Sequence, residues 1–207
     1  MTRPYSETLA AAERGIPRHY CRCKDCAFSE PLALSGWEER SVWGCDHSRG
    51  SFVARLWRNG SRARKPLASL PDGPGFYLWP ACLAVDIVAV TGMGAIPVLT
   101  ALVLLDPAAR LRPAAEIEAR IDSSPGVSEE YRDGYRRALL WVLGTESTCP
   151  GSRNSWAGGR PTAQLVDAES QLLEGRVYSQ EVEEILNQQF NGGGRAALEL
   201  ALGRRYN

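Results

Sequence analysis

Four of the six cysteines and both histidines of this chain fall within residues 19–47, which read HYCRCKDCAFSEPLALSGWEERSVWGCDH. Thiolates and imidazoles are the ligands that zinc prefers in proteins, and a tetrahedral ion needs four of them. Cys23-x-x-Cys26 offers two thiolates from one tight turn, and Cys45-x-His47 offers two further ligands from a short extended segment. Because four protein ligands leave no position open for water, the spacing predicts a structural zinc ion, not a catalytic one.

The remaining cysteines and the second histidine fall into two groups. Cys21 and His19 lie close enough in sequence to replace one of the four ligands, whereas Cys82 and Cys149 are isolated and are expected to be small, semi-apolar side chains without a special role. Residues 1–17 contain no apolar core of signal-peptide length. We therefore expect a cytoplasmic protein, because clustered cysteines in a reducing compartment are metal ligands more often than disulfides.

The run CKDCAFSE and the later WGCDHS resemble the small zinc-ribbon and zinc-knuckle modules of uncharacterised, often phage-like, proteins. The resemblance covers about the first quarter of the chain and implies a small β-hairpin with the metal at its base; it is weak for function. Val42 and Trp43 favour a strand directly before Cys45, which fits such a hairpin. The Cys-x-His pair departs from the Cys-x-x-Cys pair that is usual in a ribbon.

The chain shows no complete catalytic constellation. A zinc deaminase requires His-x-Glu followed by Pro-Cys-x-x-Cys, and neither histidine here is followed by Glu two residues later. Asp46, His47 and Asn59 imitate the start of an HNH-type nuclease pattern, but no histidine follows His47. With only two histidines, a nucleophile-histidine pair would have to draw on the metal cluster. We therefore expect a non-enzymatic protein.

Residues 49–65, RGSFVARLWRNGSRARK, follow the cysteine cluster and contain no acid. Arginines neutralise phosphates, and Phe52 and Trp57 are interleaved where they could stack on bases. The stretch predicts nucleic-acid binding through Trp57 and the cations Arg49, Arg55, Arg58, Arg62, Arg64 and Lys65. Two alternatives stay open: a solvated basic face balanced by acids elsewhere, or charge that flanks a membrane segment.

Residues 76–105 are the most apolar part of the chain, and no charge occurs from 87 to 105. That length could form a single membrane-spanning helix at about 87–105. The favoured interpretation is a buried strand at Leu83–Thr91, a Gly-Met-Gly turn and a buried helix that begins at Pro97, because Val, Ile and Thr precede the glycines.

Apolar stripes at helical spacing follow from Asp106 onward. Ser128 and Thr162 are good N-caps for two of these helices, and the glycines at 192–194 predict a break before a last helix at 195–202.

The fold class that we expect is α+β. A small N-terminal β-hairpin zinc module with a basic extension would occupy residues 1–65, and a mainly helical domain with the apolar segment would occupy residues 66–207. The leading function is a zinc-stabilised protein that binds nucleic acid. The alternatives are a protein-interaction or assembly component, with a protein partner or a second copy, and a single-pass membrane protein. No small-molecule substrate is evident.

Overall fold

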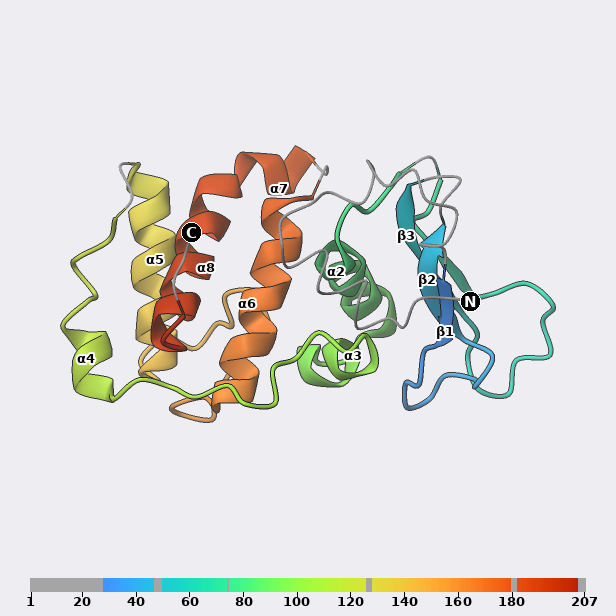
Figure 1. Ribbon diagram of the computed structural model, residues 1–207, viewed down its shortest axis with the longest axis horizontal. Coiled ribbons are helices and arrows are strands. Elements are labelled where there is room, and N and C mark those ends of the chain that lie inside the picture. Colours follow the sequence, from blue (N-terminus) through green and yellow to red (C-terminus); the bar gives the residue numbers. More distant parts are fainter. Residues whose placement is uncertain (1–27, 47–49, 74, 126–127, 180–181, 205–207) are drawn as a thin grey trace.

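The computed structural model describes residues 28–46, 50–73, 75–125, 128–179 and 182–204. Its described residues form one antiparallel sheet of four strands at one end and a group of helices at the other (Figure 1). This architecture confirms the α+β class. In chain order the elements are β1 (Phe28–Pro31), β2 (Val42–Asp46), β3 (Ser51–Leu56), β4 (Ala68–Leu70), α2 (Pro80–Thr91), α3 (Ala95–Ala101), α4 (Ala114–Glu118), α5 (Glu129–Val142), α6 (Ala163–Val177), α7 (Val182–Leu186) and α8 (Gln188–Ala201).

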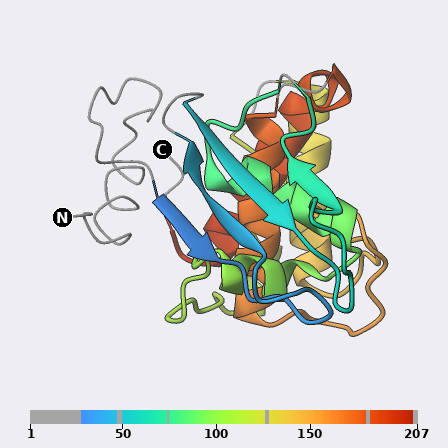
Figure 2. The ribbon, with the colours of Figure 1, turned by 90° about the vertical axis from the view of Figure 1, so that its right-hand side faces the viewer.

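The sheet, in the order β1-β2-β3-β4, buries one face against helices. Along β3, Phe52, Ala54 and Leu56 are buried, whereas Arg55 is exposed, as expected where successive side chains point to opposite faces. Trp43 of β2 lies opposite Ala54 and is buried as well. Figure 2 shows the sheet in front of the helices, which cover its rear face.

The strand predicted at Leu83–Thr91 is wrong, because these residues belong to helix α2. Pro80 occupies the first turn of α2, where its missing N–H costs no hydrogen bond, and Gly92 ends the helix with a φ of 68°. These two terminal signals outweigh the weak strand preference of Val and Ile, and Leu83 and Ile87 are buried in the core that α2 shares with the sheet. No helix within the described part of the chain is both long enough and apolar enough to cross a membrane.

Two clusters of buried side chains meet at α6. One cluster joins the sheet to α2, α3 and Leu172 of α6. The other joins α5 and α8 to Val166 and Leu173 of α6. In Figure 1, α6 accordingly lies between α2 and the pair formed by α5 and α8. The domain division predicted after residue 65 falls in the loop that joins β3 to β4, which are paired strands of one sheet.

The predicted caps of α5 and α6 are confirmed. Ser128 accepts a hydrogen bond from the backbone N–H of Tyr131, and Thr162 accepts one from that of Leu165. Each bond satisfies a donor that the first turn of the helix leaves without an intrahelical partner.

The helix break predicted at residues 192–194 is wrong, because α8 runs through these glycines. A Cβ on Gly193 would lie 1.9 Å from the carbonyl oxygen of Tyr131 on α5, and a Cβ on Gly134 would lie 2.0 Å from that of Phe190 on α8. Only glycine allows the two backbones to approach this closely, so the packing of α8 on α5 offsets the helix-breaking tendency of the glycines.

Candidate functional site

Only one of the four predicted zinc ligands, Cys45, lies in the described part of the chain. The other three, together with the two alternates, fall outside the described residues: Cys23, Cys26, His47, Cys21 and His19. Cys45 is on β2, opposite Phe28 of β1 and Phe52 of β3, with 8% of its surface exposed. Within the ranges that the structure describes, no three or more His, Cys, Asp or Glu side chains gather as a metal site would require.

Cys82 and Cys149 are free cysteines and are buried. Burial raises the pKa of the Cys82 thiol to about 12 and that of the Cys149 thiol to about 11. Both side chains therefore stay protonated at neutral pH and behave as small apolar groups, because the thiolate is the reactive form of cysteine.

The basic stretch is displayed on the surface at the sheet end of the molecule. Arg49 lies outside the described residues, and the other five predicted cations are exposed: Arg55, Arg58, Arg62, Arg64 and Lys65. Arg55 is on β3, and the other four are in the loop between β3 and β4. Figure 1 shows that this loop projects from the end of the molecule opposite α5. The described cations can therefore reach a large ligand without displacing core residues.

The loop between β3 and β4 is attached to the loop between β1 and β2 by backbone hydrogen bonds and by the side chain of Arg40. The guanidinium of Arg40 donates hydrogen bonds to the carbonyl oxygens of Ser61 and Ala63, each at 3.0 Å. The same guanidinium forms an ion pair with Glu38 and lies 5.2 Å from the centre of the Trp57 ring. These contacts place the loop backbone, and with it the exposed cations, in one conformation relative to the sheet.

The expectation that Phe52 stacks on bases is wrong, because only 1% of its surface is exposed. The alternation along β3 directs Phe52 towards the helices and Arg55 towards solvent. Trp57 is half-buried, and the Arg40 guanidinium occupies the space over its ring. The sheet end thus presents charge, with little open aromatic surface from these two residues.

The zero net charge of the chain conceals a division along the sequence. Residues 1–71 carry twelve Arg and Lys against seven Asp and Glu, whereas residues 72–207 carry twelve against seventeen. From His47 to Pro71 there is no acid. Within the described residues 50–71, five cations and no acid give a neutral protein a local field that attracts anions.

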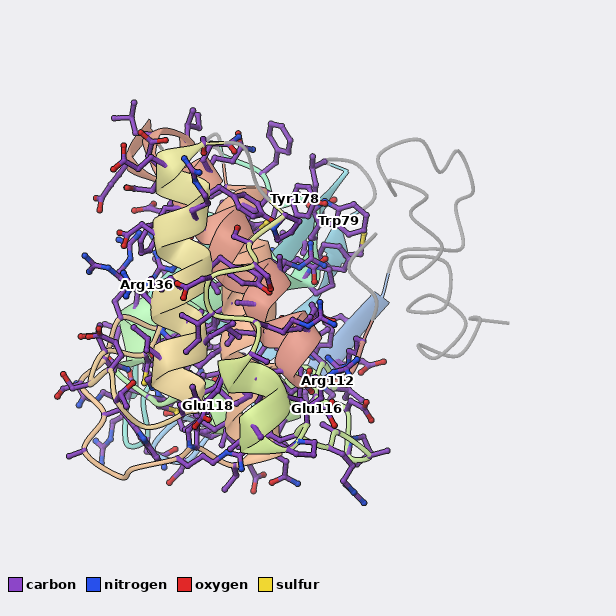
Figure 3. The ribbon with its side chains drawn as sticks, turned by 90° about the vertical axis from the view of Figure 1, so that its left-hand side faces the viewer. Trp79, Arg112, Glu116, Glu118, Arg136 and Tyr178 are labelled. Atoms are coloured by element: carbon purple, nitrogen blue, oxygen red, sulfur yellow. The ribbon has the colours of Figure 1, made fainter. Side chains whose placement is uncertain are left out.

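A cleft that the sequence did not predict lies between the segment after β4, α2, the end of α6, and α7. Its volume is about 660 Å³, and its wall includes Tyr77, Asp86 and Arg176. A second cavity of about 470 Å³ is lined in part by Trp79. The ring of Trp79 contacts that of Tyr178, which lines the larger cleft, with 5.7 Å between ring centres (Figure 3).

The sequence held one signal for the larger cleft, the isolated carboxylate of Asp86 next to the uncharged run 87–105. A charge in such a context is either paired or functional. Tyr77, which donates a hydrogen bond to Asp86, and Arg176, whose charge acts on it, lie 9 and 90 positions away, so no local motif could identify the group.

Comparisons of the chain with protein-family models, with curated proteins and with solved structures gave no match in any of the three.

Proposed function

We propose that this protein is a non-enzymatic, zinc-stabilised protein that binds nucleic acid through the phosphate backbone. The observation that carries the proposal is the group of exposed cations on and beyond β3, in a stretch of chain without an acid. Phosphate contacts of this kind depend on salt and supply most of non-specific binding to nucleic acid.

Backbone recognition is favoured over base recognition by the aromatic residues of the same stretch. Phe52 is part of the core, and the ring of Trp57 has the Arg40 guanidinium over it. Stacking of bases on aromatic side chains needs open ring faces. We therefore expect little dependence on base sequence and a strong dependence on ionic strength.

The structural zinc ion remains part of the proposal. The pairing of β1 with β2 begins with Phe28 opposite Cys45. In sequence, Cys26 precedes Phe28 by two residues and His47 follows Cys45 by two residues. We propose that Cys23, Cys26, Cys45 and His47 hold the ion at this end of the strand pair, beside the start of the basic stretch, with Cys21 and His19 as the alternates.

The nucleic-acid proposal is tested with two matched double variants. Arg62→Ala/Arg64→Ala removes two exposed cations of the loop, and Arg132→Ala/Arg136→Ala removes two exposed cations of α5. The affinity for duplex DNA and for single-stranded RNA is measured by fluorescence anisotropy between 50 and 200 mM salt. The slope of log K against log salt is negative, and each lost phosphate contact should reduce its magnitude by about 0.9 on duplex DNA.

The loop variant should therefore bind more weakly and with a shallower salt dependence, whereas the α5 variant should bind like the wild type. Equal weakening in the two variants, or no binding by the wild type at low salt, would contradict the proposal.

The zinc ion is tested by elemental analysis of protein purified under reducing conditions. We expect about one zinc per chain. Cys26→Ser should lower the zinc content, and the matched variant Cys149→Ser, which changes a buried thiol outside the cluster, should keep it. If the wild-type protein contains no zinc, the metal part of the proposal is wrong. The binding of nucleic acid by the cationic loop is tested separately by the anisotropy experiment.

A further inference from the structure

The larger cleft contains one partly buried carboxyl group, that of Asp86, which the fold leaves without an ionic partner; the carboxyl group of Asp72, which also lines the cleft, is exposed to solvent. Asp86, on α2, accepts a hydrogen bond from the hydroxyl of Tyr77. Among the described residues it forms no ion pair within 4 Å, and the apolar side chains of Val85 and Ala89 line the cleft beside it. Burial raises the pKa of the Asp86 carboxyl, while the bond from Tyr77 and the charge of Arg176 oppose the rise.

Both arginines of the cleft are already engaged. Arg176 forms an ion pair with Glu184 and donates to the carbonyl oxygen of Gly151 at 2.6 Å. Arg153 pairs with Glu183 at 3.1 Å and with Glu184 at 3.2 Å. Because these four side chains neutralise one another, the charge left for a ligand is negative and comes from Asp86, on the wall, and from the exposed Asp72.

The mouth of the cleft is aromatic and apolar. Phe76, Tyr178 and Val90 line it and are 42%, 44% and 44% exposed. Covering large apolar side chains with a ligand is favourable because it removes their surface from water, and the faces of aromatic rings attract cations. The side chains around Asp86 therefore favour a ligand with an apolar body and a positive charge.

We infer that this cleft binds a small organic cation, in which a primary ammonium group is attached to an apolar body. The ammonium has three hydrogens to donate, and the Asp86 carboxylate and the Tyr77 oxygen are acceptors side by side on the wall. The apolar body would lie against Phe76 and Tyr178. The volume of about 660 Å³ is within the range of small-molecule sites, roughly 300–1,000 Å³. This inference is independent of the nucleic-acid proposal, which concerns the exposed cations of β3 and of the loop between β3 and β4.

The experiment uses three ligands of one shape and different charge. Tryptamine is the cationic probe, tryptophol its neutral counterpart and indole-3-acetate its anionic counterpart, and each is titrated into the full chain by calorimetry at pH 7.5. We expect tryptamine to bind at least about ten times more tightly than tryptophol, and indole-3-acetate to give no heat of binding. No binding of tryptamine at millimolar concentration, or equal affinity for tryptophol, would overturn the inference.

Two variants locate the binding within the cleft. Asp86→Asn keeps an acceptor for Tyr77 but removes the charge, and should weaken tryptamine binding at least about tenfold. Its matched control is Asp122→Asn, an exposed acid outside the cleft, which should bind like the wild type. Phe76→Ala should weaken binding several-fold, because it removes a ring from the mouth of the cleft.

Thermal unfolding of each variant shows that it is folded. A folded Asp86→Asn variant that binds tryptamine as the wild type does would overturn the inference.

Discussion

At the helical end of the molecule, α5 and α8 approach until backbone meets backbone, whereas at the sheet end the loop between β3 and β4 is held by hydrogen bonds, two of which come from the side chain of Arg40. The helical contact depends on hydrogen atoms at Gly134 and Gly193, where a methyl group has no space. At residues 61–63 the loop is held by two hydrogen bonds from one partly exposed guanidinium, and backbone bonds join Trp57 and Asn59 to residues 36–38. The glycine contact between the two helices tolerates no larger side chain. The hydrogen bonds of the loop can be lost or replaced while the surrounding backbone keeps its place.

This difference shows where the chain is free to carry function. The core between α5, α6 and α8 is filled by close packing, so its residues are committed to stability. The sheet end displays cations that contribute nothing to the core, and the larger cleft retains a desolvated carboxyl group, which costs free energy in the folded state. Features that the fold does not need are the best candidates for binding.

The largest expected effect is a loss of stability when the close contact between α5 and α8 is disrupted. Gly193→Ala would place a Cβ 1.9 Å from the carbonyl oxygen of Tyr131, whereas Gly192→Ala would place one 3.7 Å from the ring of Tyr131, an ordinary contact. We expect Gly193→Ala to lower the free energy of unfolding by at least about 3 kcal/mol, because the two backbones must separate. Gly192→Ala should raise it by up to about 1 kcal/mol, the difference in helix propensity. Urea denaturation measures both, and equal effects would show that the backbones are not in close contact.

A smaller effect is expected at the sheet end. Arg40→Ala removes the bonds to Ser61 and Ala63 and should lower the free energy of unfolding by about 1 kcal/mol, since the guanidinium is partly exposed. Hydrogen exchange of the Ser61 and Ala63 amides should become faster. Arg55→Ala is the control, because it removes an exposed cation from β3 without touching the loop backbone. Unchanged exchange in Arg40→Ala would mean that other contacts hold the loop.

The sequence signals that succeeded are those that act over a few residues. Ser128 and Thr162 were recognised as caps because a cap bonds a backbone N–H three residues away. Pro80 and Gly92 are equally local signals of a helix, and they outweigh the strand preference of the residues between them. The prediction at 83–91 is wrong because it rests on strand preference without these two terminal signals.

The signals that failed depend on contacts across the fold. The glycines at 192–194 read as a break because their close approach to α5 is visible only once the helices are packed. Phe52 read as a base-stacking residue because its direction depends on the face of the sheet that the helices cover. The isolated charge of Asp86 was not enough to predict the larger cleft, since its wall is assembled from segments between residues 70 and 184.

The smallest expected effect concerns Asp86 in the larger cleft and its contribution to stability. Burial raises the folded-state pKa of the Asp86 carboxyl above its value in the unfolded chain, despite the bond from Tyr77 and the charge of Arg176. Above both pKa values the group is ionised in both states, and the folded state bears the full cost of desolvation. Asp86→Asn should therefore have a slightly higher free energy of unfolding than the wild type at neutral pH. The gain should be smaller than the loss expected for Arg40→Ala.

This advantage should shrink as the pH falls through the raised pKa and vanish below the unfolded-state value, where the wild-type carboxyl is protonated in both states. Urea denaturation of the two proteins at several pH values between 3 and 8 measures it. The cation that we infer for the cleft should stabilise the wild type, by binding only its folded state, and leave Asp86→Asn little changed. If Asp86→Asn is instead less stable than the wild type at neutral pH, the charge of Asp86 supports the fold. Asp86 would then be a structural group, like the glycines of α5 and α8, and not one that is free to bind a ligand.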